Sequence, residues 1–192
     1  MQTKYLAQEE LRSFFKSVQK GGSKRDIAMF TLSYLYGLRT SEMVNMKFED
    51  LHLDAKRIHI TRSKHGVPGV YELETDTMRL LRAYMRARKK LKHAATSPYL
   101  FLSNRSQDRP MSRWNVLKLF QKYLKQSGNQ RKLGVHSLRH STGAVLAMET
   151  GNEDGIAVRL GHRSVRSTKR YMQLGSKEEM KRQREFNKLL KL

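Results

Sequence analysis

The chain has 192 residues, 39 of them Lys or Arg and 17 Asp or Glu, so its formal net charge is +22 and its pI is about 10.5. The length suffices for one domain with a hydrophobic core, and the basic excess favours a polyanionic partner. No apolar run approaches the roughly 18 residues of a membrane span, and the N-terminus lacks the apolar stretch of a signal peptide. The absence of cysteine excludes disulfides and cysteine-based metal sites. We therefore expect a cytoplasmic protein without a membrane partner.

Helical periodicity dominates the first fifty residues. Apolar side chains recur every three to four positions over residues 11–18 and 27–35, which predicts two helices. The first ends at a glycine pair. The second ends at Gly37, a residue that suits the left-handed position after a helix. Ser41 is expected to cap a third, short helix, and a turn is expected over residues 50–54.

The hydrophobic period changes to two between residues 57 and 74. Ile58 and Ile60 alternate with polar residues, and a turn rich in Gly separates them from a second alternating segment that ends near Leu73. This pattern predicts a β-hairpin or a small antiparallel sheet. Lys64 lies in the expected turn, where a long flexible amine could reach a groove and donate a proton.

Helices are predicted for most of the remaining chain, whereas the apolar run 99–102 fits no single type of element. The expected helices, in chain order, are 75–91 (capped by Thr75 or Asp76), 112–128 (opened by Ser112), 137–150, a short helix ending at Leu160, a short helix carrying Tyr171, and a last helix that begins with the capping box of Ser176 and Glu179. Without a repeat or a long linker, we expect one domain over residues 1–175 and a helical tail over 176–192.

Two arginines, two histidines and a tyrosine recur at short spacings. Arg39 follows a helix end, Arg139 lies three residues after His136 on one helical face, and Tyr171 follows His162 by nine residues. A guanidinium grips two phosphate oxygens, an imidazole transfers protons near neutral pH, and a phenol beside such cations can be a nucleophile. These groups are the ones needed to cleave a phosphodiester without a metal.

The motifs resemble those of the tyrosine recombinase (phage integrase) family over roughly residues 3–175. The matching segments are Tyr-Gly-Leu-Arg-Thr-Ser-Glu at 36–42 for the first arginine box, Lys64 for the hairpin lysine, His-Ser-Leu-Arg-His at 136–140 for the second box, and Leu-Gly-His at 160–162 with Tyr171 nine residues beyond. Two features depart from the family. His65 and Gly66 follow the lysine where a second basic residue is common. The chain also begins at the catalytic domain, so we expect a fragment or a minimal single-domain member, like the fimbrial phase-variation invertases.

The resemblance implies a mainly α (α+β) fold, with helices and a small antiparallel sheet, and site-specific recombination of double-stranded DNA. The implied catalytic residues are Arg39, Lys64, His136, Arg139, His162 and Tyr171, with Glu42 and His140 in supporting roles. No cofactor, metal or ATP is expected, because the covalent protein–DNA bond stores the energy of the phosphodiester. We also expect a homotetramer on paired sites, with the tail docked on a neighbouring copy or, alternatively, on its own domain.

In the family mechanism the tyrosine attacks the scissile phosphate, forms a 3′-phosphotyrosine and releases a 5′-hydroxyl. By resemblance, Arg39 and Arg139 would hold the non-bridging oxygens, and Lys64 would protonate the leaving 5′-oxygen. His136 would assist proton transfer from the tyrosine, and His162 would hydrogen-bond the phosphate.

Other interpretations stay open at this point. Type IB topoisomerases have a similar tyrosine and arginines but relax DNA without pairing two sites, and a non-catalytic DNA-binding regulator could retain the fold. Arg39 could instead balance a helix dipole, Lys64 could be a solvated turn residue, and Tyr171 could belong to an apolar core. A stripe of arginines is interpreted as a solvated helix face: Arg79, Arg82, Arg86 and Arg88.

Overall fold

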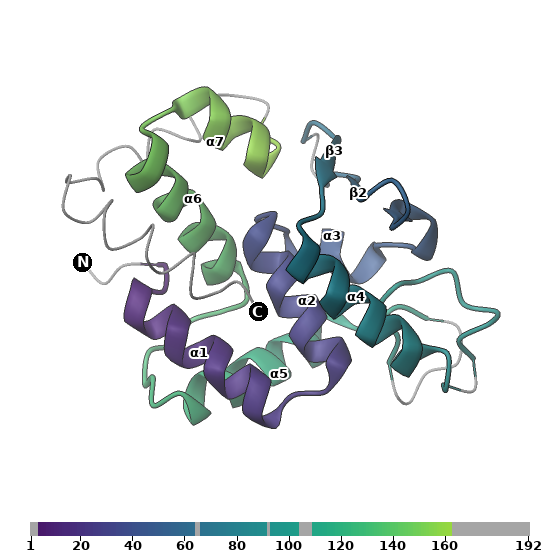
Figure 1. Cartoon of the computed structure of the whole chain (residues 1–192). Coiled ribbons are helices and arrows are strands. Elements are labelled where there is room, and N and C mark those ends of the chain that lie inside the picture. The colour runs from purple at the N-terminus through teal and green to yellow at the C-terminus, as the bar shows by residue number, and fades with distance from the viewer. Residues whose placement is uncertain (1–3, 64–65, 92, 104–108, 163–192) are drawn as a thin grey trace.

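The computed structural model describes residues 4–63, 66–91, 93–103 and 109–162, and the side chain of Glu149 is not described. In this part of the chain, seven α-helices accompany one small sheet (Figure 1). The elements are α1 (Gln8–Gly21), α2 (Lys24–Leu35), α3 (Thr40–Asn45), the 3₁₀ turn η1 (Phe48–Asp50), β1 (Leu51–His52), β2 (Arg57–Ile60), β3 (Gly69–Glu72), α4 (Thr75–Arg88), α5 (Arg113–Gln126), α6 (His136–Thr150) and α7 (Glu153–Leu160). The predicted mainly α fold with a small antiparallel sheet is confirmed.

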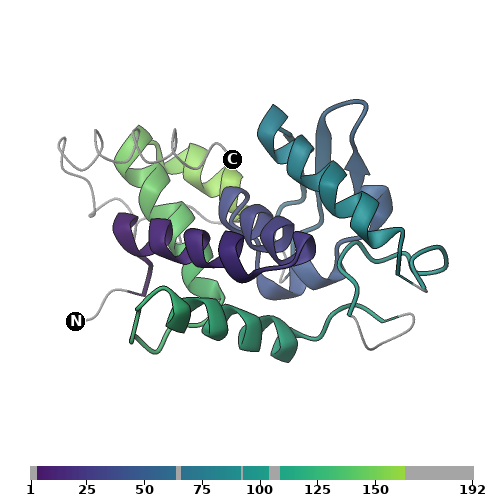
Figure 2. The same cartoon turned by 60° about the horizontal axis from the view of Figure 1, so that its bottom comes forward.

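An aromatic cluster joins α1, α2 and α5. The ring of Phe14 packs against Phe30 at 5.6 Å and against Phe120 at 5.1 Å between centroids, and all three side chains are fully buried. Helices α1 and α5 consequently run side by side (Figure 2). Aromatic pairs at these separations stabilise a core beyond the burial of their area. The cluster holds α2 in place. The C-terminal end of α2 leads into residues 36–42, the first arginine segment.

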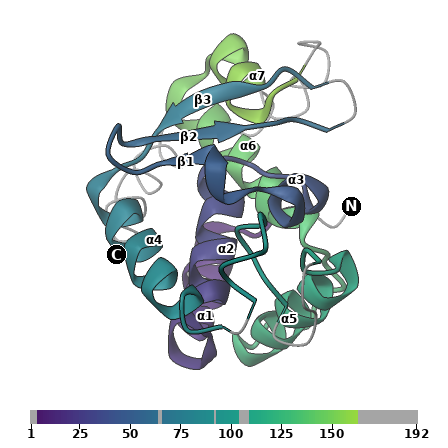
Figure 3. The same cartoon turned by 90° about the vertical axis from the view of Figure 1, so that its right-hand side faces the viewer.

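The sheet is antiparallel with the order β1-β2-β3. In the pair β2–β3, Ile58 lies opposite Tyr71 and Ile60 opposite Gly69, and both isoleucines are buried, as their alternation predicted. Figure 3 shows the sheet beside α7. The turn expected over residues 50–54 is wrong in its first half, because residues 51 and 52 pair with β2. A two-residue strand is too short to produce a periodic pattern.

Glycines end three helices as predicted. Gly37, Gly151 and Gly161 all have positive φ, at 56°, 59° and 61°. Glycine has no β-carbon, so its backbone adopts this left-handed conformation at no steric cost. The Ser112 cap of α5 is also confirmed, since its hydroxyl accepts a hydrogen bond from the Asn115 backbone N–H at 3.1 Å.

Two predicted helix starts are wrong. Helix α3 begins one residue before Ser41, with Arg39 at the cap position, where the Glu42 carboxylate accepts the Arg39 backbone N–H at 2.9 Å. Helix α4 is preceded by Glu74, so neither Thr75 nor Asp76 is its cap. Several polar residues in a row each satisfy the preference for a cap, so the sequence alone does not choose among them. Within the run 99–102, residues 100–102 are buried and Tyr99 is half-buried, and the run forms only isolated bridges.

Arg88 does not belong to the solvated stripe. Arg79, Arg82 and Arg86 are exposed, but Arg88 is only 4% exposed. Its guanidinium donates to four carbonyl oxygens, those of Ala94, Ser97, Tyr99 and Leu100, at 2.7–3.2 Å. Arg88 thereby fixes the loop after α4. Helix α4 ends at Arg88, earlier than the predicted end at residue 91. None of the helices described is both long and apolar enough to cross a membrane.

Candidate active site

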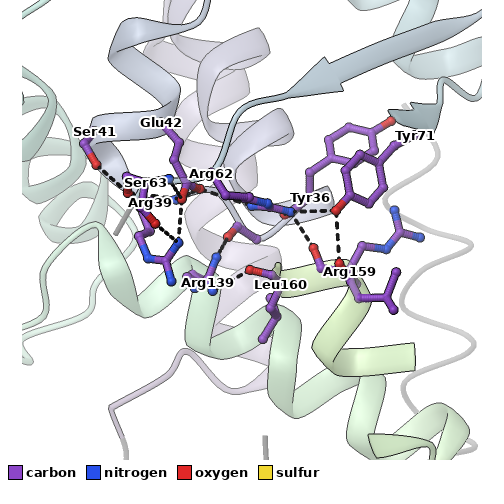
Figure 4. A network of polar contacts seen from close by, with 12 residues as sticks. Tyr36, Arg39, Ser41, Glu42, Arg62, Ser63, Tyr71, Arg139, Arg159 and Leu160 are labelled. Atoms are coloured by element: carbon purple, nitrogen blue, oxygen red, sulfur yellow. Dashed lines mark hydrogen bonds and ion pairs between the residues drawn. The ribbon is translucent and has the colours of Figure 1, made fainter. Parts of the chain in front are cut away.

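Glu42 is the centre of a buried polar network at the start of α3. Its side chain is 1% exposed, and its carboxylate accepts hydrogen bonds from two guanidinium groups, Arg39 at 2.6 Å and Arg62 at 3.1 Å. The backbone N–H of Ser63 donates to it at 3.0 Å. The carboxylate therefore joins the first arginine segment to the residues that follow β2 (Figure 4).

The environment of Glu42 favours its charged form. Burial alone would raise the pKa of the carboxyl group. Hydrogen bonds from the backbone and side chain of Arg39, the backbone hydrogen bond of Ser63 and the charge of Arg62 outweigh burial and lower the pKa below its ordinary value. Glu42 is thus an anionic support for two arginines, as the supporting role expected of it requires. Arg39, whose side chain is 20% exposed, keeps access to solvent.

Arg139 ties the second motif to the other two. It lies in α6, is 2% exposed, and donates to the carbonyl of Gly37 at 2.5 Å and to that of Leu160 at 2.6 Å. Gly37 lies two residues before Arg39 and Leu160 two residues before His162. One buried guanidinium therefore holds together segments that are more than a hundred residues apart in the sequence (Figure 4).

Gly37 and Leu160 approach each other closely. A β-carbon at Gly37 would overlap Leu160 Cδ2, and the positive φ of Gly37 disfavours any side chain there. The turn after α2 is completed by the backbone hydrogen bond from Leu38 to Ser33, at 3.0 Å. The glycine in the first arginine segment thus serves both to end α2 and to admit the end of α7.

Gly161 plays a similar part beside His162. Its φ is 61°, and a β-carbon there would lie 2.7 Å from Arg62 Cγ. The backbone N–H of His162 donates to the carbonyl of Ala157 at 2.8 Å, which fixes the chain as it leaves α7. The His162 side chain is half-buried.

His136 and His140 meet on α6. Their rings are 4.6 Å apart between centroids and nearly perpendicular. His136 is exposed at the first turn, whereas Arg139, on the same side of the helix by spacing, is buried. This face of α6 therefore spans the boundary between solvent and interior.

Lys64 and Tyr171 lie outside the described residues. The lysine's role in the hairpin and the tyrosine's role as nucleophile stay predictions, as do the helix around Tyr171 and the tail over residues 176–192. In the part of the chain that the structure describes, no three His, Asp or Glu side chains group as metal ligands would.

The contacts of two residues in the network, Arg62 and Tyr71, were not predicted from the sequence. Arg62 follows Ile58 and Ile60 in the same alternation, and its burial continues theirs. An arginine in phase with a buried face indicates a buried anion or a set of carbonyls as its partner, so a usable signal was present. The pairing of Tyr71 with α7 had none, because its partner is a backbone carbonyl, that of Val158 at 3.0 Å.

Tyr36 lies at the edge of this network. Burial raises its pKa to about 12, although the charge of Arg159 acts in the opposite direction. Its hydroxyl donates to the carbonyl of Glu72 at 2.8 Å, and the guanidinium of Arg159 lies 5.7 Å from its ring centre. A phenol so protonated and engaged is a structural donor and a poor nucleophile.

Comparison with known proteins shows the family to which the chain belongs. The model of the phage integrase family matches residues 4–178. The chain belongs to this family. It is 30% identical over 169 residues to the type 1 fimbriae regulatory protein FimE of Escherichia coli K12, covering 88% of this chain and 84% of FimE. It is 28% identical to the tyrosine recombinase XerA of Pyrococcus furiosus, covering 91% of this chain and 58% of XerA.

Solved structures share the fold. The crystal structure of XerA recombinase superposes with a TM-score of 0.79 at 23% identity, over 95% of this chain and 64% of that one. The lambda integrase catalytic core gives a TM-score of 0.61 at 19% identity, over 83% of this chain and 96% of the core. The chain thus corresponds to nearly all of an isolated catalytic core and to about two thirds of XerA.

Proposed function

We propose that this protein is a site-specific tyrosine recombinase, which cleaves and rejoins double-stranded DNA through a 3′-phosphotyrosine. One observation carries the proposal. Arg139 donates to the carbonyls of Gly37 and Leu160, so the segments bearing Arg39 and His162 are held against the helix that bears His136. Positively charged and proton-transferring groups therefore converge from three distant segments of a family member.

The proposed chemistry divides among these groups. Tyr171 attacks the scissile phosphorus, the bond to the 5′-oxygen breaks, and Lys64 supplies the proton to that oxygen. Arg39 and Arg139 stabilise the charge on the non-bridging oxygens, which is the usual source of most of the acceleration. His136 accepts the tyrosine proton, with the neighbouring His140 in support. His162 hydrogen-bonds the phosphate.

Rejoining reverses these steps with a 5′-hydroxyl from the partner duplex. The phosphotyrosine conserves the energy of the phosphodiester, so the exchange needs neither ATP nor a metal ion. Guanidinium groups supply the charge that a metal would otherwise provide. The raised pKa of Tyr36 supports the choice of a different tyrosine as nucleophile.

The assembly proposed is a tetramer on two paired sites in the cytoplasm. Strand exchange between two duplexes requires four cleavage sites, and a solved lambda integrase structure of the same fold is described as a tetramer bound to a Holliday junction. Residues 1–175 form the catalytic domain in this proposal. Residues 176–192 form a tail whose apolar side chains dock on the neighbouring copy, because so short a helix is marginal alone. Truncation after Gly175 would then reduce assembly on paired sites and spare binding to a single site.

The decisive experiment traps the covalent intermediate. A nicked DNA site lets the short cleaved strand diffuse away, so the protein–DNA adduct accumulates and runs as a shifted band on a denaturing gel. Tyr171→Phe should bind this DNA like the wild type and form no adduct, because only the hydroxyl is lost. Tyr99→Phe, which removes a hydroxyl from another segment, is the matched control and should form adduct normally.

Three results would contradict the proposal. An adduct that persists in Tyr171→Phe would show that another residue is the nucleophile. Loss of wild-type adduct in EDTA, restored by added magnesium, would show that the chemistry depends on a metal. Plasmid relaxation that does not depend on paired sites would identify a topoisomerase instead.

A further inference from the structure

Arg62 is a buried arginine to which the family motifs assign no role. It follows β2, and its side chain has no exposed surface. Its Nη1 pairs with Glu42 at 3.1 Å, but that carboxylate is already shared with Arg39. Arginines are almost never fully buried unless their position is fixed by several partners. The partners on the other side of the guanidinium indicate what this position achieves.

The second terminal nitrogen of Arg62 points to the end of α7. Nη2 lies 2.5 Å from the carbonyl oxygen of Arg159, 3.1 Å from that of Tyr36 and 3.2 Å from the Tyr71 hydroxyl (Figure 4). Two hydrogens serve these three oxygens, and the shortest contact is to α7. The Tyr71 hydroxyl in turn donates to the carbonyl of Val158 at 3.0 Å.

These contacts fix carbonyls that a helix cannot satisfy by itself. The last four carbonyls of a helix lack intrahelical partners, so a helix end frays unless something holds it. Here Arg62 holds Arg159, and Arg139 holds Leu160. The aliphatic part of Arg62 also lies against Gly161, where an added β-carbon would be 2.7 Å from Cγ and 2.8 Å from Cδ.

His162 is the next residue after this contact. We infer that Arg62 is a positioning residue for DNA cleavage, which fixes His162 relative to Arg39 by holding the end of α7 to the Glu42 carboxylate. The inference rests on the proposed recombinase function, because there His162 binds the scissile phosphate. Lysine cannot replace Arg62 in this role, since one ammonium nitrogen cannot reach both the carboxylate and the α7 carbonyls as a planar guanidinium does.

The first test is Arg62→Lys, which keeps the charge and loses the second set of contacts. Affinity for intact DNA should stay at the wild-type value, while the rate of adduct formation on the nicked site falls about 100-fold, the scale expected for a misplaced group near the reacting atoms. Arg88→Lys is the matched control. Arg88 is also buried and also donates to several carbonyls, but it fixes the loop after α4. Its variant should lower the melting temperature and leave the rate of adduct formation unchanged.

A double-mutant cycle separates positioning from general loosening of the fold. If Arg62 acts through His162, Arg62→Lys should slow adduct formation little in a chain that already carries His162→Ala, because the group it positions is gone. Equal slowing in both backgrounds would overturn the inference, as would a wild-type rate in Arg62→Lys alone.

Tyr71→Phe gives a second route if Arg62→Lys does not fold. The change removes only the hydroxyl that links Arg62 to Val158, and it should slow adduct formation about 10-fold, a smaller misplacement, again without further effect in the His162→Ala background. An unchanged rate in Tyr71→Phe would then overturn the inference. The wild type is measured first: if it forms no adduct, the proposed function fails and this inference with it, whereas equal rates for wild type and variants reject this inference alone.

Discussion

Arg62 and Arg139 donate to the carbonyls of adjacent residues in the last turn of α7. Arg62 follows β2 in the first half of the sequence, and Arg139 lies in α6 in the second half. Each also binds a carbonyl of the turn between α2 and α3, Arg62 that of Tyr36 and Arg139 that of Gly37. The negative end of a helix dipole favours such cations. Two parallel bridges therefore connect the end of α7 to the start of the first arginine segment.

Replacing Glu42 with Gln should destabilise the protein by about 3 kcal/mol at neutral pH, because two buried guanidinium groups lose their shared anion. Since folding lowers the Glu42 pKa, its contribution is complete above its ordinary value of 4.5 and is lost as the pH falls through the lower folded value. The difference in free energy of unfolding between wild type and variant should therefore shrink below pH 4.5. Urea unfolding followed by circular dichroism at several pH values measures this difference.

Glu9→Gln provides the control for that experiment. Glu9 pairs with Arg12 at the surface, at 3.7 Å and with its side chain 76% exposed, and such pairs contribute little. Its substitution should leave the stability nearly unchanged at every pH. A Glu42→Gln protein as stable as the wild type at neutral pH would show that the buried network is not held by this carboxylate.

Gly161→Ala and Gly151→Ala form a matched pair. Both glycines follow a helix with nearly the same positive φ, 61° and 59°, but only Gly161 faces a neighbour, Arg62, while Gly151 has open space. The Gly151 change should cost only the backbone strain, about 1 kcal/mol. The Gly161 change should cost more and also slow adduct formation, because Arg62 must move. Thermal unfolding measures both losses of stability. Equal losses for the two variants would show that Arg62 can move away from a β-carbon at position 161 without a cost in stability.

Alkaline unfolding should depend on buried tyrosines. Burial raises the pKa of Tyr36 and of Tyr84 to about 12. A raised folded pKa contributes stability that is complete below the unfolded value of 10.0 and is lost as the pH rises toward 12. The free energy of unfolding should thus fall between these values, and Tyr84→Phe should flatten that fall at some cost to stability at neutral pH, because its hydroxyl donates to Leu100 at 2.7 Å. Ultraviolet absorbance of phenolate during the titration gives an independent check.

DNA affinity should fall steeply with salt. The net charge of +22 implies that many counterions leave the DNA on binding, and contact with even six phosphates gives a slope of about −5 for the logarithm of the affinity against that of the salt concentration. Fluorescence anisotropy with a labelled duplex measures the slope. A value near zero would mean that the charge serves some other partner.

Much of the fold followed from periodicity. The helical pattern of Phe14 and its neighbours and the alternation of Ile58 and Ile60 each reflect one buried face, and the structure buries those faces. Caps were less predictable. Ser41 satisfies a general preference, but in the structure Arg39 occupies the cap position, and the Glu42 carboxylate accepts the Arg39 backbone N–H while also pairing with the guanidinium groups of Arg39 and Arg62.

The candidate site residues were predicted from side chains in sequence motifs. Arg139 and Gly161 were identified from such motifs, and the structure shows what each contacts. The contacts of Arg62 and Tyr71 with α7 depend on backbone carbonyls nearly a hundred residues away. Every residue has a carbonyl, so a sequence offers nothing by which to select the one that becomes a partner.

The long sequence separation between Glu42 and Leu160 also sets an order of events during synthesis. A ribosome adds about 5–20 residues per second, so roughly 6–24 s pass between the emergence of the first arginine segment and that of the end of α7. For most of this interval Arg139 has not been made, so the carbonyl of Gly37 lacks that partner, and until the interval ends Arg62 lacks the carbonyls of α7. The contacts that join the end of α7 to Arg62, Arg139 and the first arginine segment can therefore form only after most of the last third of the chain has emerged.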